Sequence, residues 1–72
     1  MTSLGLYLAK KTVNKAEVSR RTGISTSRLS ELSLKENAHL RAKELYLIAL
    51  AIDVDPCEVL KEVYGEVKLT NG

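Results

Sequence analysis

Apolar residues recur at helical spacing along this chain. The clearest run consists of Leu45, Ile48, Ala49 and Ile52. Their i, i+3, i+4, i+7 spacing places all four on one face of a helix, which predicts a buried helix over residues 42–52. Leu29 and Leu32 repeat the i, i+3 spacing and predict the inner face of a shorter helix upstream. The pattern therefore favours a helical domain.

Helix-capping residues mark two further helices, one near each end of the chain. Ser3 is a good N-cap and predicts a helix that runs to about Lys11. Asp55 before Pro56 predicts the start of the other, because a proline fits the first helical turn that follows an acidic cap. Gly65 is expected to end that helix.

The stretch from Asn14 to Ser25 carries the strongest motif. Asn14 can cap a helix, and Glu17 three residues later has the capping-box spacing. Gly23 suits the left-handed residue that follows a helix, and Ser25 can cap the next one. Two short helices joined by such a tight turn form a helix-turn-helix, which offers its second helix to the major groove of DNA. Residues 33–40 are then expected to form a loop.

These elements predict one compact all-α domain of five short helices over residues 1–65. The chain has no Trp and no Phe, so we expect a modest core of Leu, Ile, Val and Ala. Residues 66–72 form a tail, in which residues 66–69 alternate like a short strand. The tail is expected either to add a strand to a partner's tail or to be disordered.

Charge is distributed unevenly along the chain, although the formal net charge is only +2. Residues 10–28 carry six Lys or Arg and one Glu, whereas residues 53–72 carry two Lys and five Asp or Glu. A basic N-terminal half suits a polyanion, and an acidic C-terminal half suits a different partner. An unevenly charged, solvated surface is the alternative.

Several classes of protein are not supported by these residues. The apolar runs are shorter than the roughly 20 residues of a membrane span, and no basic segment precedes the first apolar residues, as one does in a signal peptide. The single cysteine, Cys57, cannot form an internal disulfide, so we expect a cytoplasmic protein. His39 has no second His or Cys nearby with which to share a metal. Without a catalytic triad, a paired acid and base or a phosphate-cradling loop, we expect no enzyme, cofactor or metal site.

Four stretches carry a family resemblance, namely Val18 before the turn, Gly23-Ile24-Ser25 at the turn, Leu29-Ser30 after it, and residues 45–55. They resemble the XRE-type helix-turn-helix family, the lambda-repressor-like DNA-binding domains of phage repressors and bacterial regulators. The resemblance covers roughly residues 4–63, in the five-helix order of that family. It implies a domain that lays the second helix of its motif in the major groove.

The resemblance places base-contacting side chains at the start of this recognition helix. They are Thr26, Ser27 and Arg28, with Glu31 one turn later. Arg28 has a planar fork that can grip guanine through two hydrogen bonds, and Glu31 can accept one from the amino group of cytosine. Alternatively, Thr26 and Ser27 are ordinary polar residues of a first turn. In that case Arg28 and Glu31 form a local surface ion pair.

Four other residues are expected to contact DNA phosphates, namely Lys15, Ser25, Lys35 and Asn37. Lys15 stands in the first turn of its helix, where backbone amides and a lysine together favour an anion. Simple solvent exposure is the alternative for Lys15.

These features predict a sequence-specific DNA-binding transcriptional regulator, repressor-like, with double-stranded DNA as its partner. A domain this small buries little DNA surface, so we expect a homodimer on a two-fold operator with half-sites about one helical turn apart. The family resemblance implies a dimer interface around the last helix and tail, at Cys57, Lys61, Tyr64, Val67 and Leu69. The alternative is a protein-interaction module, such as an antitoxin or regulator subunit, whose acidic C-terminal half binds a protein partner. No membrane partner is expected.

Overall fold

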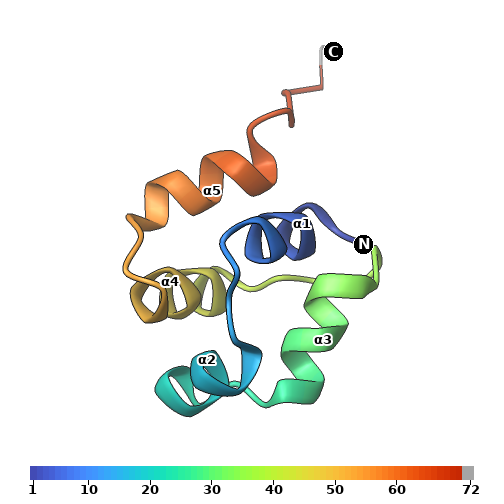
Figure 1. Ribbon diagram of the computed structural model, residues 1–72. Helices are drawn as coiled ribbons and strands as arrows, with labels where there is room; N and C mark the ends of the chain where they lie inside the picture. The colour runs from blue at the N-terminus through green and yellow to red at the C-terminus, as the bar shows by residue number, and fades with distance from the viewer. Residues whose placement is uncertain (71–72) are drawn as a thin grey trace.

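The computed structural model describes residues 1–70 of the chain, which contain five α-helices (Figure 1). They are α1 (Ser3–Lys10), α2 (Lys15–Thr22), α3 (Thr26–Leu34), α4 (Ala42–Ala51) and α5 (Pro56–Tyr64). No strand occurs within these residues, and the predicted all-α fold is confirmed. None of the described helices has both the length and the apolar character needed to cross a membrane.

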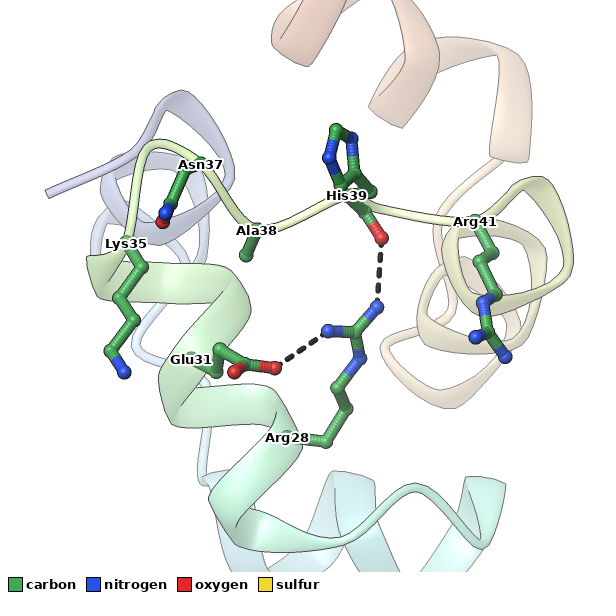
Figure 2. Close-up of a pocket in the computed structure, with 7 residues that line it drawn as sticks. All are labelled: Arg28, Glu31, Lys35, Asn37, Ala38, His39 and Arg41. Carbon is green, nitrogen blue, oxygen red and sulfur yellow. Dashed lines mark hydrogen bonds and ion pairs between the residues drawn. The ribbon is translucent and has the colours of Figure 1, made fainter.

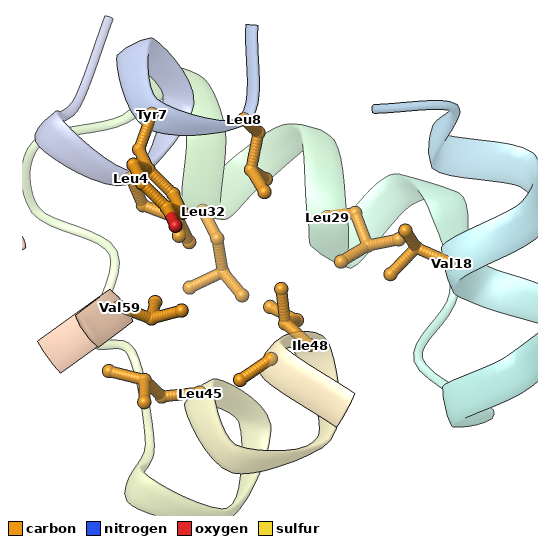
Figure 3. Packing of buried hydrophobic residues seen from close by; sticks show 10 residues of the cluster. Leu4, Tyr7, Leu8, Val18, Leu29, Leu32, Leu45, Ile48 and Val59 are labelled. Carbon is orange, nitrogen blue, oxygen red and sulfur yellow. The ribbon is translucent and has the colours of Figure 1, made fainter. Parts of the chain in front are cut away.

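The five helices pack in pairs around a shared core. α1 lies against α3 and α5, α2 lies against α3 and α4, and α4 lies against α5 (Figure 1). The buried cluster consists of Leu4, Tyr7, Leu8, Val18, Leu29, Leu32, Leu45, Ile48, Ala49 and Val59 (Figure 3). Every helix therefore contributes to the core, and α3 is held between α1 and α2.

Tyr7 corrects the prediction of a core made only of Leu, Ile, Val and Ala. Its side chain is buried on α1, and its hydroxyl donates a hydrogen bond to Oε2 of Glu58 on α5 at 2.8 Å. The ring can enter the core because its one polar atom has a partner at the edge of that core. Sequence reasoning missed this residue because its partner lies 51 positions away.

The predicted helix-turn-helix is confirmed between α2 and α3. The Asn14 side chain accepts hydrogen bonds from the amides of the first turn of α2, at 2.9 and 3.3 Å. Gly23 has a φ of 80°, the left-handed conformation that glycine adopts without strain. Ser25 then caps α3. Glu17 does not form the predicted capping box among the described residues, because its carboxylate pairs with two arginines further along α2.

The start of α1 differs from the prediction. Thr2, not Ser3, is the N-cap, and its Oγ1 accepts from the Gly5 amide at 2.9 Å. The same hydroxyl lies 2.7 and 3.0 Å from the carbonyl oxygens of Leu32 and Ser33, at the end of α3. The Thr2 amide also donates to the Ser33 carbonyl at 2.9 Å. Residue 2 is the cap because it serves the first turn of α1 and the last carbonyls of α3 together.

α3 ends later than predicted, because Ser33 and Leu34 belong to the helix and not to the loop expected over residues 33–40. Ser33 is buried, and its hydroxyl donates to the Leu29 carbonyl at 2.8 Å, so it fits inside the last turn. The neighbouring Gly5 permits close contact with α1, since a Cβ at that position would lie 2.2 Å from the Ser33 oxygen. The end of α3 is thus pinned to the start of α1.

The described part of the tail extends away from the helices (Figure 1). Residues 67–70 have no regular secondary structure, and Leu69 is 97% exposed. The strand-like alternation of residues 66–69 forms no strand within this single chain, so pairing with a partner's tail stays a prediction. The predicted tail also included residues 71 and 72, which lie outside the described residues.

Candidate nucleic-acid interface

α3 buries one face and exposes the other. Leu29, Leu32 and Ser33 face the core. The outer side forms a shallow surface hollow lined by Thr26, Ser27, Ser30, Glu31, Leu34 and Lys35. This face combines hydroxyls, one carboxylate and one apolar side chain, which are the groups that match base edges in the major groove. We refer to these six residues as the outer face of α3.

Ser25 stands at the start of this surface. Its Oγ accepts a hydrogen bond from the Arg28 amide at 3.0 Å, as an N-cap does. Since the oxygen is used as an acceptor, the hydroxyl proton is left for another partner. The cap of α3 therefore has the chemistry to donate to a phosphate at a helix N-terminus.

The side chain of Arg28 points toward α4 and the loop that precedes it. Its Nε and Nη2 donate to the two carboxylate oxygens of Glu44 on α4, at 2.9 and 3.0 Å. Nη1 donates to Oε1 of Glu31 at 2.6 Å, and Nη2 also donates to the His39 carbonyl at 2.7 Å (Figure 2). The Arg28–Glu31 ion pair, one of the two alternatives from the sequence, is therefore present. The guanine contact of Arg28 stays a prediction.

The Arg28–Glu44 pair is shielded from solvent. The side chains are 26% and 14% exposed, respectively. Hydrogen bonds from Arg28 lower the pKa of the Glu44 carboxyl below its usual value, although partial burial acts in the opposite direction. The hydrogen bond to Glu44, followed by the one to Glu31, raises the pKa of the Arg28 guanidinium. The two groups therefore remain charged together, as a bidentate pair that joins α3 to α4.

A second hollow lies between the end of α3 and the loop that leads to α4 (Figure 2). Its lining consists of Arg28, Glu31, Lys35, Asn37, Ala38, His39 and Arg41. Lys35 and Arg41 are exposed on either side of it, and within the described residues neither forms an ion pair. Two unpaired cations at the rim of a polar hollow suit an anion such as a phosphate.

The structure brings most of the predicted site residues together. Glu31 and Lys35 line both hollows, so the predicted base contacts adjoin the predicted phosphate contact Asn37. Lys15 stands apart at the first position of α2, is half-buried, and lines neither hollow. Whether any of these residues touches DNA stays a prediction.

Sequence reasoning did not single out Ser30 and Leu34, which line the first hollow, or Arg41, which lines the second. Ser30 and Leu34 follow Ser27 by three and seven positions, so the helical spacing of α3 held the signal that they share its outer side. The apolar side chain of Leu34 suits the methyl group of thymine. Arg41 gave no local signal, because its place beside Arg28 depends on how the loop folds back.

No group of three or more His, Cys, Asp or Glu with a geometry that suits a metal ion occurs among the described residues. The chain matches the family model of the Cro/C1-type helix-turn-helix DNA-binding domain over residues 4–63. That match includes α2, α3 and α4 and reaches into α1 and α5. Comparison with curated proteins and with solved structures found no match.

Proposed function

This chain belongs to the Cro/C1-type helix-turn-helix family of DNA-binding domains, and we propose that it is a sequence-specific, repressor-like transcriptional regulator. The observation that carries the proposal is the outer face of α3, a surface of hydroxyls, charged groups and one leucine that the helix-turn-helix presents to solvent. In this proposal α3 lies in the major groove of double-stranded DNA. A DNA-binding regulator acts where the DNA is, so a cytoplasmic location is part of the proposal. The family is one of DNA-binding domains, and we propose no enzymatic activity.

We propose that Thr26, Ser27 and Glu31 contact base edges. The first two are exposed at the N-terminal end of α3, the end that enters the groove first in this motif. Glu31 is one turn further along the same side and offers a carboxylate to an amino group of cytosine. A direct guanine contact by Arg28 requires its guanidinium to leave both Glu44 and Glu31, and it is the alternative tested in the next subsection.

We propose that phosphate contacts flank the base contacts on both sides. Ser25 supplies one at the turn, Lys15 supplies one at the first position of α2, and Lys35 and Asn37 supply them beyond the end of α3. Arg41 joins the second group because it borders the same hollow. Such contacts position the protein on DNA and carry no sequence information by themselves.

We also propose that two copies bind a two-fold operator. α5 and the tail carry exposed apolar side chains at Leu60, Tyr64, Val67 and Leu69, on a part of the molecule away from α2 (Figure 1). Apolar groups exposed in a single chain suit contact with a partner. Half-sites about one helical turn apart are the expected spacing for such a dimer.

Selection from a random duplex library at near-physiological salt tests the proposal. We expect a palindromic motif and, in sedimentation, a complex of two chains per duplex. A motif without a palindrome contradicts the dimer alone. Failure of the folded, concentrated protein to recover any motif contradicts the regulator. It favours the second candidate, a protein-interaction module that uses the exposed apolar groups of α5 and the tail.

Salt dependence tests the phosphate contacts separately. Replacing Lys35 by Ala is expected to weaken binding to all sequences about equally and to reduce the slope of log affinity against log salt by about 0.9. Lys68→Ala removes the same charge from the tail, away from α3, and is expected to leave the slope unchanged. Equal slopes for the two variants contradict the contact at Lys35.

A further inference from the structure

We propose that Arg28 is a positioning residue, which orients Glu31 and the recognition helix, and that it does not read a base itself. This inference rests on the proposed DNA-reading role of α3. It assigns base discrimination at one operator position to Glu31, which is oriented by Arg28, while Glu44 holds Arg28 in place.

The first support is the number of donors that Arg28 has left. A guanidinium carries five N–H groups, and four of them are used by Glu44, Glu31 and the His39 carbonyl. A bidentate grip on guanine needs two free N–H groups on one edge of the fork. Only one N–H, on Nη1, remains, so the arrangement leaves no free edge for guanine.

The second support is what Arg28 would leave behind. Glu44 is 14% exposed, and its Oε1 also accepts from the Arg41 amide at 2.9 Å. Withdrawing Arg28 leaves a shielded carboxylate without its cation, which is strongly unfavourable. The same withdrawal breaks the bond to His39, which holds the loop between α3 and α4. These costs favour an Arg28 side chain that stays in place when DNA binds.

The third support concerns Glu31. A carboxylate on a DNA-binding surface is repelled by phosphates, and a free side chain points in many directions. Here Arg28 offsets the charge and fixes Oε1 at 2.6 Å, while the side chain stays 43% exposed. Among the described residues no donor contacts the second oxygen, Oε2, which leaves it to accept from a base amino group. Arg28 thus holds a base acceptor in one orientation.

The test compares operator selection by the wild-type chain with selection by a double variant, Arg28→Met with Glu44→Met. Replacing a shielded ion pair by apolar side chains of similar length preserves folding in many proteins, whereas removing one partner alone does not. Circular dichroism and thermal unfolding test whether the double variant is folded. Arg20→Met is the matched control, since Arg20 also pairs with a glutamate three residues away but lies exposed on α2.

We expect the double variant to lose roughly tenfold in discrimination at the base pair that Glu31 reads, and at that base pair only. Glu31→Gln should change the preference at the same base pair, and adding it to the double variant should have little further effect. Arg20→Met should leave all base preferences unchanged. The milder Glu44→Gln variant, which keeps a hydrogen-bonding partner for Arg28, should reproduce part of the loss if the double variant does not fold.

Two results overturn the inference while leaving the proposed function intact. One is that the double variant and Glu31→Gln alter different base pairs, because Arg28 then reads a base of its own. The other is that the double variant keeps the full wild-type motif. If the wild-type chain recovers no motif at all, the proposed function fails and this inference fails with it.

Discussion

α3 and α5 are both helices of nine residues, yet the fold holds them differently. α3 buries three residues, is joined to α4 through Arg28 and Glu44, and ends against Thr2. α5 fully buries one residue, Val59, and only partly buries Val63. Its Glu58 accepts a hydrogen bond from Tyr7 of α1 and forms a longer ion pair with Lys11. This difference agrees with the proposed function, in which α3 must hold one position to read bases and α5 leaves apolar surface exposed for a partner.

Matched leucine truncations should give the largest difference between the two helices. Leu29→Ala in α3 removes a side chain that is 1% exposed, and we expect it to lower the free energy of unfolding by about 2–5 kcal/mol. Leu60→Ala makes the same change in α5 at a position that is 49% exposed, with an expected cost of about 0.5 kcal/mol or less. Urea unfolding at low protein concentration measures both. Equal costs would show that α5 is packed as firmly as α3.

Gly5→Ala should have the next largest effect, because it disrupts the close contact between α1 and the end of α3. The new Cβ meets the Ser33 carbonyl oxygen at 2.2 Å, and backbone cannot move aside as a side chain does. We expect a loss of about 1–3 kcal/mol, together with faster amide exchange at Thr2. Gly23→Ala is the control, since nothing lies within 4 Å of its Cβ and its cost comes from φ alone. If Gly23→Ala also speeds amide exchange at Thr2 by more than its loss of overall stability explains, the contact between Gly5 and Ser33 does not hold Thr2 locally.

The smallest expected effect concerns the hydrogen bond between Tyr7 and Glu58, which joins α5 to α1 and should be lost at alkaline pH. Burial first, and then Glu58, raises the pKa of Tyr7 from 10.0 to about 12. Because the folded state favours the protonated phenol, this contribution is complete below pH 10.0 and is lost as the pH rises toward about 12. Tyr7→Phe should lower the free energy of unfolding by about 1 kcal/mol at neutral pH. Between pH 10.0 and about 12 the free energy of unfolding of this variant should fall less than that of the wild type. Tyr46→Phe, exposed on α4, is the control and should decline as the wild type does.

The helices could be predicted because their signals are local. The spacing of Leu45, Ile48 and Ala49 and the caps at Asn14 and Ser25 each depend on residues within about one or two turns. Thr2 could not be identified as a cap in the same way, because the carbonyls that favour it lie 30 and 31 positions along the chain. The same limit explains why Tyr7 was missed in the core.

The sequence could predict which residues lie on the candidate site but not what each side chain contacts. The family resemblance singles out Thr26, Ser27 and Glu31 as base contacts, and the structure places all three on one hollow. The engagement of Arg28 depends on Glu44, 16 positions away, so no pattern within α3 distinguishes an arginine that faces DNA from one that faces α4. Residue type alone favoured guanine, and tertiary contacts decide where the guanidinium goes.

The tie between Arg28 and Glu44 also bears on how such a domain can be given a new operator. A recognition helix grafted from a relative would carry its own residue at position 28 and would meet Glu44 unchanged on α4. An exchange of α3 alone is therefore expected to leave a stranded carboxylate and a misplaced helix, whereas an exchange that includes position 44 transfers specificity with its support. Among relatives of this chain, the identities at positions 28 and 44 should change together.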